Sequence, residues 1–138
     1  MMQTQQISRR QFRWFRNTEQ FRLGRANEDR LWKVFQELLC SMEKPEWLKS
    51  VRRATKHEDM HLETDFVVET HDIGPMFFNA KSSEYYAEKF NGYRRSRRVI
   101  AIPMDAVLAA NQQAAEDFIL KILWQEYVDI RILRGDSI

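Results

Sequence analysis

Residues 64–81 read TDFVVETHDIGPMFFNAK, and this stretch decides the expected fold. Residues 64–70 are rich in β-branched side chains, which favour an extended strand. The breaker HDIGP at 71–75 follows, and residues 76–81 are again mostly apolar. Two strand-like runs joined by a Gly-Pro breaker predict a β-hairpin centred near residues 72–73.

The predicted hairpin would gather polar groups at one of its ends. Pairing about the centre places Asp65 opposite residues 80–81, at a cross-strand distance of about 5 Å. Because side chains alternate along a strand, Asn79 and Lys81 share one face and can converge with Asp65. A charged strand end is unfavourable unless it is paired or binds something, so we expect either an Asp65–Lys81 salt bridge or a binding site. The apolar residues around them are expected to form the core: Phe66, Val67, Val68, Phe77 and Phe78.

The segments that flank the hairpin read as alternating helices and strands. Residues 28–42 carry apolar side chains at spacings of three and four, which predicts an amphipathic helix. Residues 45–51 fit a short helix that starts at a proline, or an edge strand. The remaining expected elements are a helix at 84–90, a strand at 99–102, a long helix from 105 with a break near Asn111, and a final strand at 128–132. This order predicts a mixed α/β domain.

Length and composition indicate one globular domain. The chain has 138 residues with 4 Gly and 3 Pro, so we expect a single domain over residues 24–138. A basic and aromatic segment at residues 1–23 would be frayed or partly docked. The single cysteine, Cys40, excludes an internal disulfide and a Cys-pair zinc site. No apolar run approaches the roughly 18 residues that span a membrane, and no signal-peptide pattern is seen, so a cytoplasmic location is expected.

The net charge of +2 conceals a segregation of charge along the chain. Residues 1–33 are basic, and residues 89–98 form a second basic run without an acid. Between them, residues 57–72 carry six carboxylates and neither Lys nor Arg. Because arginines bind phosphates and carboxylates hold divalent cations, this distribution favours a metal-dependent enzyme that acts on a polyanion. Solvated faces that aid solubility are the alternative reading.

Three short motifs carry a resemblance to a known family. They are GRANE at 24–28, TDF at 64–66 and FNAKSS at 78–83. In this order, and on these expected elements, the motifs resemble the restriction-endonuclease-like, PD-(D/E)xK nuclease superfamily over residues 24–103. The resemblance implies an α/β restriction-endonuclease-like core, with a mixed central sheet and a catalytic hairpin flanked by helices. It also implies hydrolysis of phosphodiester bonds in nucleic acid with Mg²⁺ or Mn²⁺, and we expect a DNA endonuclease.

The resemblance also implies roles for particular residues. Asp65 would be the central metal ligand, completed by Glu28 and the carbonyl oxygen of Ala80. Lys81 would orient the attacking water and stabilise the charge that develops on the phosphate. The residues expected to contact nucleic acid are Ser82, Arg94, Arg95, Arg97 and Arg98.

Position 79 departs from the family pattern, because Asn79 stands where an acid or a glutamine is usual. An amide oxygen can bind Mg²⁺ but brings no charge, so Asp59, Glu63 and Glu69 are candidates to compensate. We expect activity to be retained, because Glu28, Asp65 and Lys81 are present. The alternative is a catalytically inactive nucleic-acid-binding or interaction module on the same fold.

A competing motif lies just before the hairpin. His57-Glu58-Asp59-Met60-His61 matches H-E-x-x-H, in which two histidines on a helix bind zinc and the glutamate activates water. A strand is expected to begin three residues later, and no third ligand has a recognised spacing. Loop histidines exposed to solvent are therefore the favoured reading, and a zinc peptidase is a distant alternative.

A homodimer is the other partner expected from the sequence. The aromatic residues at the N-terminus, and the apolar stripe of the long helix, would suit an interface between two copies. That stripe consists of Phe118, Ile122 and Leu123.

Overall fold

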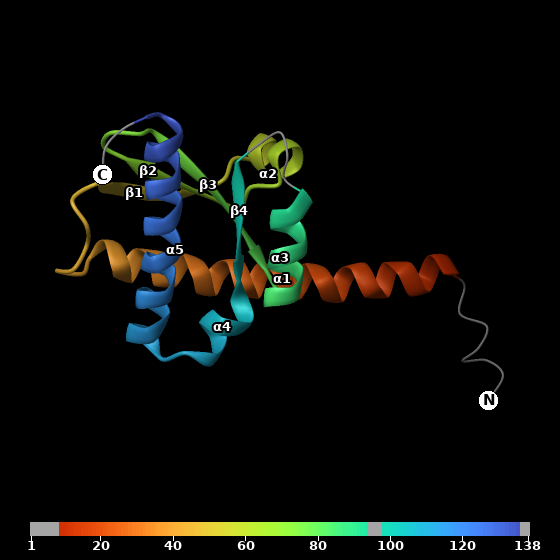
Figure 1. Cartoon of the computed structure of the whole chain (residues 1–138). Coiled ribbons are helices and arrows are strands. Elements are labelled where there is room, and N and C mark those ends of the chain that lie inside the picture. Colours follow the sequence, from red (N-terminus) through yellow and green to blue (C-terminus); the bar gives the residue numbers. More distant parts are fainter. Residues whose placement is uncertain (1–8, 94–97, 136–138) are drawn as a thin grey trace.

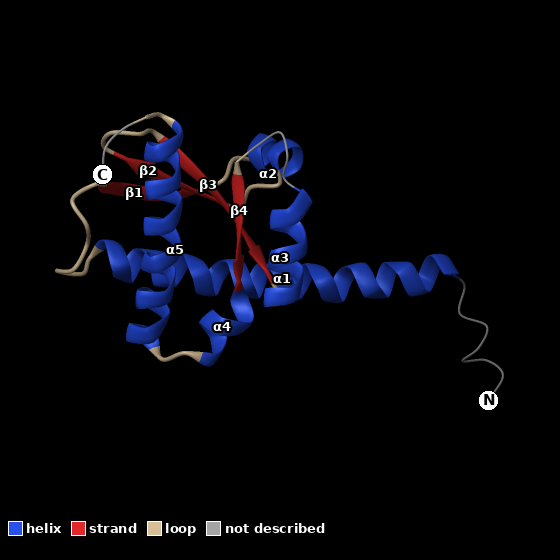
Figure 2. Cartoon of the chain, in the orientation of Figure 1, coloured by secondary structure: helices blue, strands red, loops and turns tan. Residues whose placement is uncertain are grey.

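The computed structural model describes residues 9–93 and 98–135, with the side chains of the first helix described from Gly24 onward. It is an α/β fold in which a four-stranded mixed sheet is flanked by helices (Figures 1 and 2). The elements in chain order are α1 (Arg9–Leu39), β1 (Leu48–Arg53), α2 (Lys56–Leu62), β2 (Phe66–Thr70), β3 (Pro75–Lys81), α3 (Glu84–Tyr93), β4 (Val99–Pro103), α4 (Met104–Ala109) and α5 (Gln112–Leu133).

The strands are ordered β1-β2-β3-β4 across the sheet. The first three strands are antiparallel to their neighbours, whereas β4 runs parallel to β3. A parallel neighbour needs a crossover connection, and α3 supplies it. The predicted hairpin is therefore confirmed as β2 and β3, and the predicted strand at 99–102 as β4.

The two faces of the sheet are covered by different helices, as strand alternation requires. Phe66 and Phe78 are fully buried on the face against which α1, α4 and α5 pack (Figure 1). Val67 points to the opposite face, where α3 packs on β3 and β4. Of the predicted core residues, Phe77 alone is half-buried, on the α3 side. Both faces of β2 are thus dry, which explains its unbroken apolar run.

The register of the hairpin differs slightly from the prediction. Phe66 pairs with Phe78, so the hairpin is centred on Asp72 rather than between residues 72 and 73. The Thr70 hydroxyl causes this tight turn, because it donates to the Gly74 carbonyl at 2.7 Å and accepts from the Ile73 amide at 3.1 Å. Gly74 has a φ of 81°, which side chains other than glycine rarely adopt.

Two predictions need correction, and a third had left two alternatives open. The helix expected from residue 28 begins instead at Arg9, so the boundary expected between residues 23 and 24 falls inside α1. Of the helix and the edge strand considered for residues 45–51, the structure has the edge strand, which begins at Leu48. The final strand expected at 128–132 is wrong, because α5 continues to Leu133. Asn111 is the N-cap of α5, and its side chain accepts from the Ala114 amide. The predicted break in the long helix near Asn111 is therefore confirmed. Within the described residues, no helix is both long and apolar enough to cross a bilayer.

Candidate functional site

Asp65 lies just before the first residue of β2. Its backbone amide donates to the Phe78 carbonyl at 2.9 Å, and its carbonyl accepts from the Ala54 amide at 2.9 Å. Its carboxylate accepts a third backbone bond, from the Ala80 amide at 2.8 Å. These bonds fix the carboxylate at the end of the hairpin, close to the place that the sequence predicted.

Glu28 reaches the same point from α1. Its half-buried carboxyl group forms a hydrogen bond with Asp65. The structure thus brings together an acid of the first helix and an acid of the hairpin, 37 positions apart in the sequence. Two carboxyl groups form such a hydrogen bond when one of them keeps its proton.

The electrostatics of the pair are consistent with a shared proton. Burial, the hydrogen bond to Asp65 and the charge of Asp65 raise the pKa of Glu28 from 4.5 to about 8. Burial also raises the pKa of Asp65, although the hydrogen bonds from Glu28 and the Ala80 amide and the charge of Lys81 oppose that rise. At neutral pH the carboxyl group of Glu28 therefore keeps its proton and donates it to Asp65.

A small open pocket of about 100 Å³ adjoins the two acids. It is lined by Glu28, Arg53, Ala54, Asp59, Thr64 and Asp65. Asp59 comes from α2, and its charge contributes to raising the pKa of both Glu28 and Asp65. Of the three acids that could compensate for the missing charge at position 79, which are Asp59, Glu63 and Glu69, Asp59 is thus the one that lines the pocket. In the described part of the chain, no three His, Cys, Asp or Glu side chains lie close enough together to enclose a metal ion.

Arg53 forms the basic wall of this pocket. Its guanidinium pairs with Asp29 at 3.0 Å and lies 5.2 Å from the centroid of the Trp32 ring. The ion pair and the cation–π contact hold the charge beside the pocket. Sequence analysis missed this residue, because neither its spacing nor its neighbours mark it.

Lys81 and Asn79 lie on β3 beside the pair of acids. The ammonium of Lys81 is 4.8 Å from the centroid of the Phe90 ring of α3, which holds it over an apolar surface. Asn79 is 6% exposed, and its amide nitrogen donates to the backbone carbonyl of Glu63 at 2.7 Å. The Asn79 side-chain oxygen has no partner among the described residues. Asn79 therefore ties β3 to the end of α2, a bond that a carboxylate could not donate.

The residues expected to contact nucleic acid are placed unevenly. Ser82 is exposed just before α3. Arg98 pairs with two acids of α5, Glu126 at 2.8 Å and Asp129 at 3.6 Å, so its guanidinium is engaged within the chain. Arg94, Arg95 and Arg97 lie outside the described residues.

The H-E-x-x-H segment is a helix and not a loop, contrary to the expectation. His57 and His61 are exposed on α2 with ring centroids 4.6 Å apart. A capping box forms the start of this helix: Thr55 accepts from the Glu58 amide, and Glu58 accepts from the Thr55 amide. The helix ends at Glu63, which has a φ of 51°.

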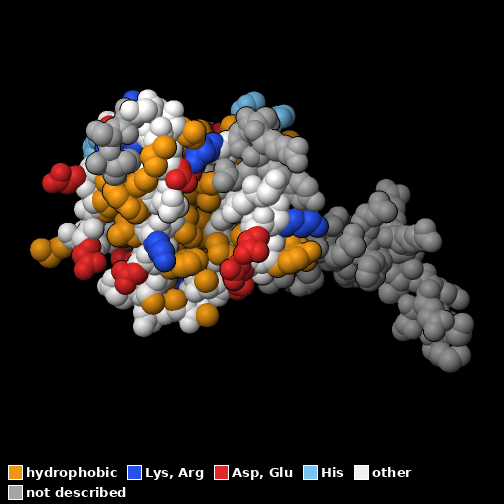
Figure 3. All heavy atoms as spheres, viewed as in Figure 1, with side chains coloured by type: hydrophobic (Ala, Val, Ile, Leu, Met, Phe, Trp, Pro, Cys, Tyr) orange, Lys and Arg blue, Asp and Glu red, His pale blue; other side chains and the backbone are white. Residues whose placement is uncertain are grey.

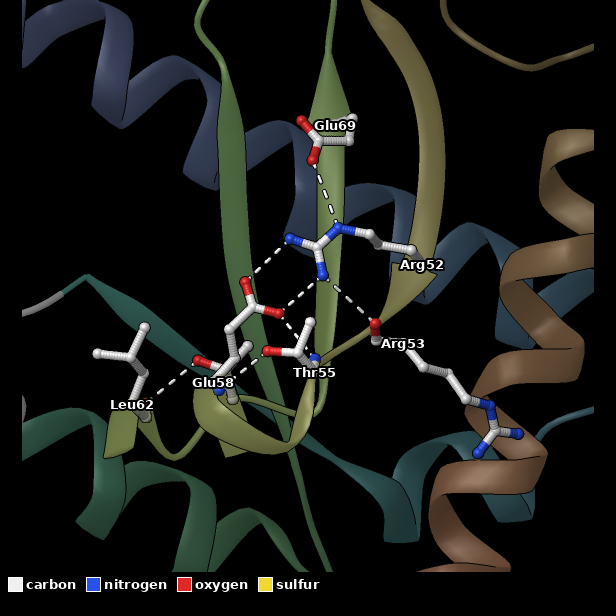
Figure 4. Close-up of polar contacts among 7 residues, drawn as sticks. Arg52, Arg53, Thr55, Glu58, Leu62 and Glu69 are labelled. Carbon is white, nitrogen blue, oxygen red and sulfur yellow. Dashed lines mark hydrogen bonds and ion pairs between the residues drawn. The ribbon is translucent and has the colours of Figure 1, made fainter. Parts of the chain in front are cut away.

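Glu58 is committed to Arg52 of β1 rather than to the histidines (Figure 4). Its two oxygens accept from the guanidinium at 2.7 and 2.9 Å, and Arg52 also approaches Glu69 at 3.7 Å. The hydrogen bond from Arg52 is the main cause that lowers the pKa of Glu58 to about 2. A carboxylate held in this way is a poor general base for zinc-bound water. The same pair of residues anchors α2, and with it Asp59, over the pocket.

Comparison of the chain with protein-family models, with curated proteins and with solved structures found no match.

Proposed function

We propose that this chain is a metal-dependent nuclease of the restriction-endonuclease-like type, which hydrolyses phosphodiester bonds of DNA. The observation that carries the proposal is that the carboxyl groups of Glu28, from α1, and Asp65, from the start of the hairpin, meet at one small pocket. Two carboxylates in such a place are more stable when a positive charge replaces the proton, and hard divalent cations prefer oxygen ligands. The mixed sheet with its hairpin and flanking helices is compatible with the core that the sequence resemblance implies.

The donor groups fit Mg²⁺ or Mn²⁺. Glu28 and Asp65 would hold the cation together with the Ala80 carbonyl oxygen, while Asp59 adds negative charge at the rim of the pocket. A bound cation would polarise the phosphate and lower the pKa of a bound water. The protein holds Asp65 rigidly through the Ala80 amide, so this carboxylate needs no reorganisation when it binds.

Lys81 has the electrophilic role in this proposal. Its charge is among the influences that lower the pKa of Asp65, which supports a role for the ammonium beside that carboxylate. It would stabilise the additional negative charge of the transition state and orient the attacking water. The ammonium lies 4.8 Å from the centroid of the Phe90 ring of α3, and this contact limits its freedom.

Asn79 favours a second candidate, a catalytically inactive nucleic-acid-binding module. The amide of Asn79 is used to bind the Glu63 carbonyl, and it brings no charge to the pocket. The zinc peptidase is not favoured, because Arg52 occupies Glu58.

Cleavage of a supercoiled plasmid in the presence of Mg²⁺ or Mn²⁺ tests the proposal. We expect nicking or linearisation by the natural chain, and a loss of at least 100-fold in Asp65→Ala and Lys81→Ala. Asp117→Ala, at an exposed position of α5, is the matched control and should cleave normally. Cleavage that persists in both variants would overturn the proposal, and so would a natural chain that cleaves with neither Mg²⁺ nor Mn²⁺.

A further inference from the structure

Helix α1 has two halves of different character. From Leu31 onward it carries fully buried residues, whereas Gly24, Arg25 and Ala26 are exposed. Figure 1 shows that the helix continues in the same direction and that its N-terminal half projects beyond the sheet and the other helices. The helix therefore leaves the body of the protein next to Glu28, the residue that lines the pocket.

The projecting half carries the net positive charge of the chain. Residues 9–25 contain six arginines and one acid, Glu19, for a net charge of +5. Because the whole chain carries +2, the rest of the sequence carries −3. On the face of the body drawn in Figure 3, hydrophobic side chains gather over α5, and the basic side chains among the described residues are scattered. The net positive charge of the sequence is thus concentrated in residues 9–25 of α1.

A helix of this kind gains stability from a polyanion. An isolated helix of about 15 residues is marginally stable in water, because it lacks a packed apolar face. Closely spaced arginines also repel one another, and phosphates relieve that repulsion while releasing counterions. A second copy of the chain would bring an arm with the same charge, so charge complementarity favours nucleic acid over a dimer of arms.

We propose that residues 9–25 form a basic arm that binds the phosphate backbone of the nucleic acid whose phosphodiester enters the pocket of Glu28 and Asp65. The part that concerns the pocket rests on the proposed nuclease function, whereas binding by the arm can be measured alone. At 1.5 Å per residue the arm is about 24 Å long, which matches about seven base pairs of duplex. Because the arm continues along α1 to Glu28, which lines the pocket, the arm would set the direction in which the backbone leaves the site.

Binding of the full-length chain to a fluorescein-labelled 20-base-pair duplex, measured by anisotropy in EDTA between 50 and 300 mM KCl, tests the arm. The variant Arg9→Gln/Arg10→Gln/Arg13→Gln removes three charges from the arm. Each phosphate contact contributes about 0.9 to the slope of log K against log salt, so we expect the slope to decrease by about 2 to 3. The affinity at 50 mM KCl should decrease at least tenfold. The control Lys44→Gln/Lys49→Gln/Lys121→Gln removes the same charge from the body and should change the slope by less than 1.

Two outcomes would overturn the proposal that the arm binds nucleic acid. One is an equal effect of the two triple variants on the salt slope. The other is an unchanged slope accompanied by dissociation of a dimer in sedimentation, which would make the arm a contact between copies. Tight binding through the arm without cleavage in Mg²⁺ or Mn²⁺ would refute the nuclease proposal but support the proposed role of the arm. Cleavage by a protein whose DNA binding does not depend on the arm would support the nuclease proposal and refute the proposed role of the arm.

Discussion

The side-chain amide of Asn79 donates to the backbone carbonyl of Glu63, and this 2.7 Å bond joins the β2–β3 hairpin to the end of α2. Glu63 has a left-handed backbone conformation, so its carbonyl cannot be satisfied by continuing the helix. An amide at position 79 thus has a structural reason, whatever the site does. It stabilises the connection that brings Asp59 from α2 and Asp65 from the start of β2 to one pocket.

We therefore expect Asn79→Asp to destabilise the fold by about 1–3 kcal/mol, because a carboxylate would face the Glu63 carbonyl without a proton to donate. Urea unfolding at pH 7.5 measures the change. The matched control is Asn91→Asp. Asn91 uses its oxygen to accept from the Ala101 amide at 2.9 Å, a bond that aspartate can also accept. A loss of stability that is equal in both variants would contradict the assigned role of the Asn79 amide.

The stability of the metal-free protein should fall as the pH rises from about 4.5 to about 8. In that range Glu28 holds a proton in the folded state, where its pKa is about 8, but not in the unfolded chain, where it is near 4.5. The folded state then binds more protons, so a rise in pH favours unfolding. After allowance for solvent screening of a half-exposed group, we expect a loss of about 1–2 kcal/mol.

Thermal unfolding in EDTA at several pH values checks this dependence. Glu28→Gln keeps a donor towards Asp65 but has no proton to lose, so its stability should change less across the same range. If the natural chain and Glu28→Gln lose stability in parallel, the shared proton is not the cause.

Mn²⁺ should stabilise the protein more strongly at pH 8 than at pH 5.5, because the cation and the shared proton compete for the same oxygens. At a free concentration 100 times Kd, the gain is about 2.7 kcal/mol. We expect Asp65→Asn to abolish the rise in Tm and Asp59→Asn to reduce it, since Asp59 lines the pocket without touching the pair. Asp117→Asn serves as the control. A rise in Tm that is insensitive to Asp65→Asn would place the metal elsewhere.

Much of the fold could be predicted from local patterns. The hairpin, the parallel strand after it and the helix over residues 28–39 follow from strand alternation, turn residues and helical spacing. The end of α5 could not, because Val128, Ile130 and Ile132 alternate with polar residues as a strand would. Continuity with the helix capped at Asn111 overrides that short pattern.

The candidate site was only partly accessible to sequence reasoning. The contact between Glu28 and Asp65 was expected, because the resemblance to the restriction-endonuclease-like superfamily implies that Glu28 lies at the same site as Asp65. The clamp between Arg52 and Glu58 was not expected, because it depends on how α2 folds back over β1. Such a contact leaves no periodic pattern in the sequence. Asp59 could therefore be named as one of three candidate acids, but the sequence could not show that Asp59 is the one at the pocket.

The clamp itself should contribute measurably to the stability of α2. Arg52 and Glu58 form a bidentate pair in which Glu58 is 14% exposed, so we expect a coupling energy of about 1 kcal/mol in a double-mutant cycle of Arg52→Met and Glu58→Gln. Hydrogen exchange of the α2 amides should increase in Arg52→Met. Lys56→Gln, at an exposed position of the same helix, is the control. Additive effects of the two substitutions would show that the pair does not anchor α2.

Substitution of Arg98 tests whether this residue stabilises the fold or contacts nucleic acid. Its partner Glu126 is 2% exposed, so Arg98→Met would leave a buried carboxylate without this cation and should destabilise the fold by about 3 kcal/mol. The double variant Arg98→Met/Glu126→Met removes both charges and should recover most of that stability. Chemical unfolding of the two variants, with duplex binding measured alongside, distinguishes the roles. If Arg98→Met weakens DNA binding and leaves stability unchanged, the guanidinium contacts phosphate and the ion pair with α5 is incidental.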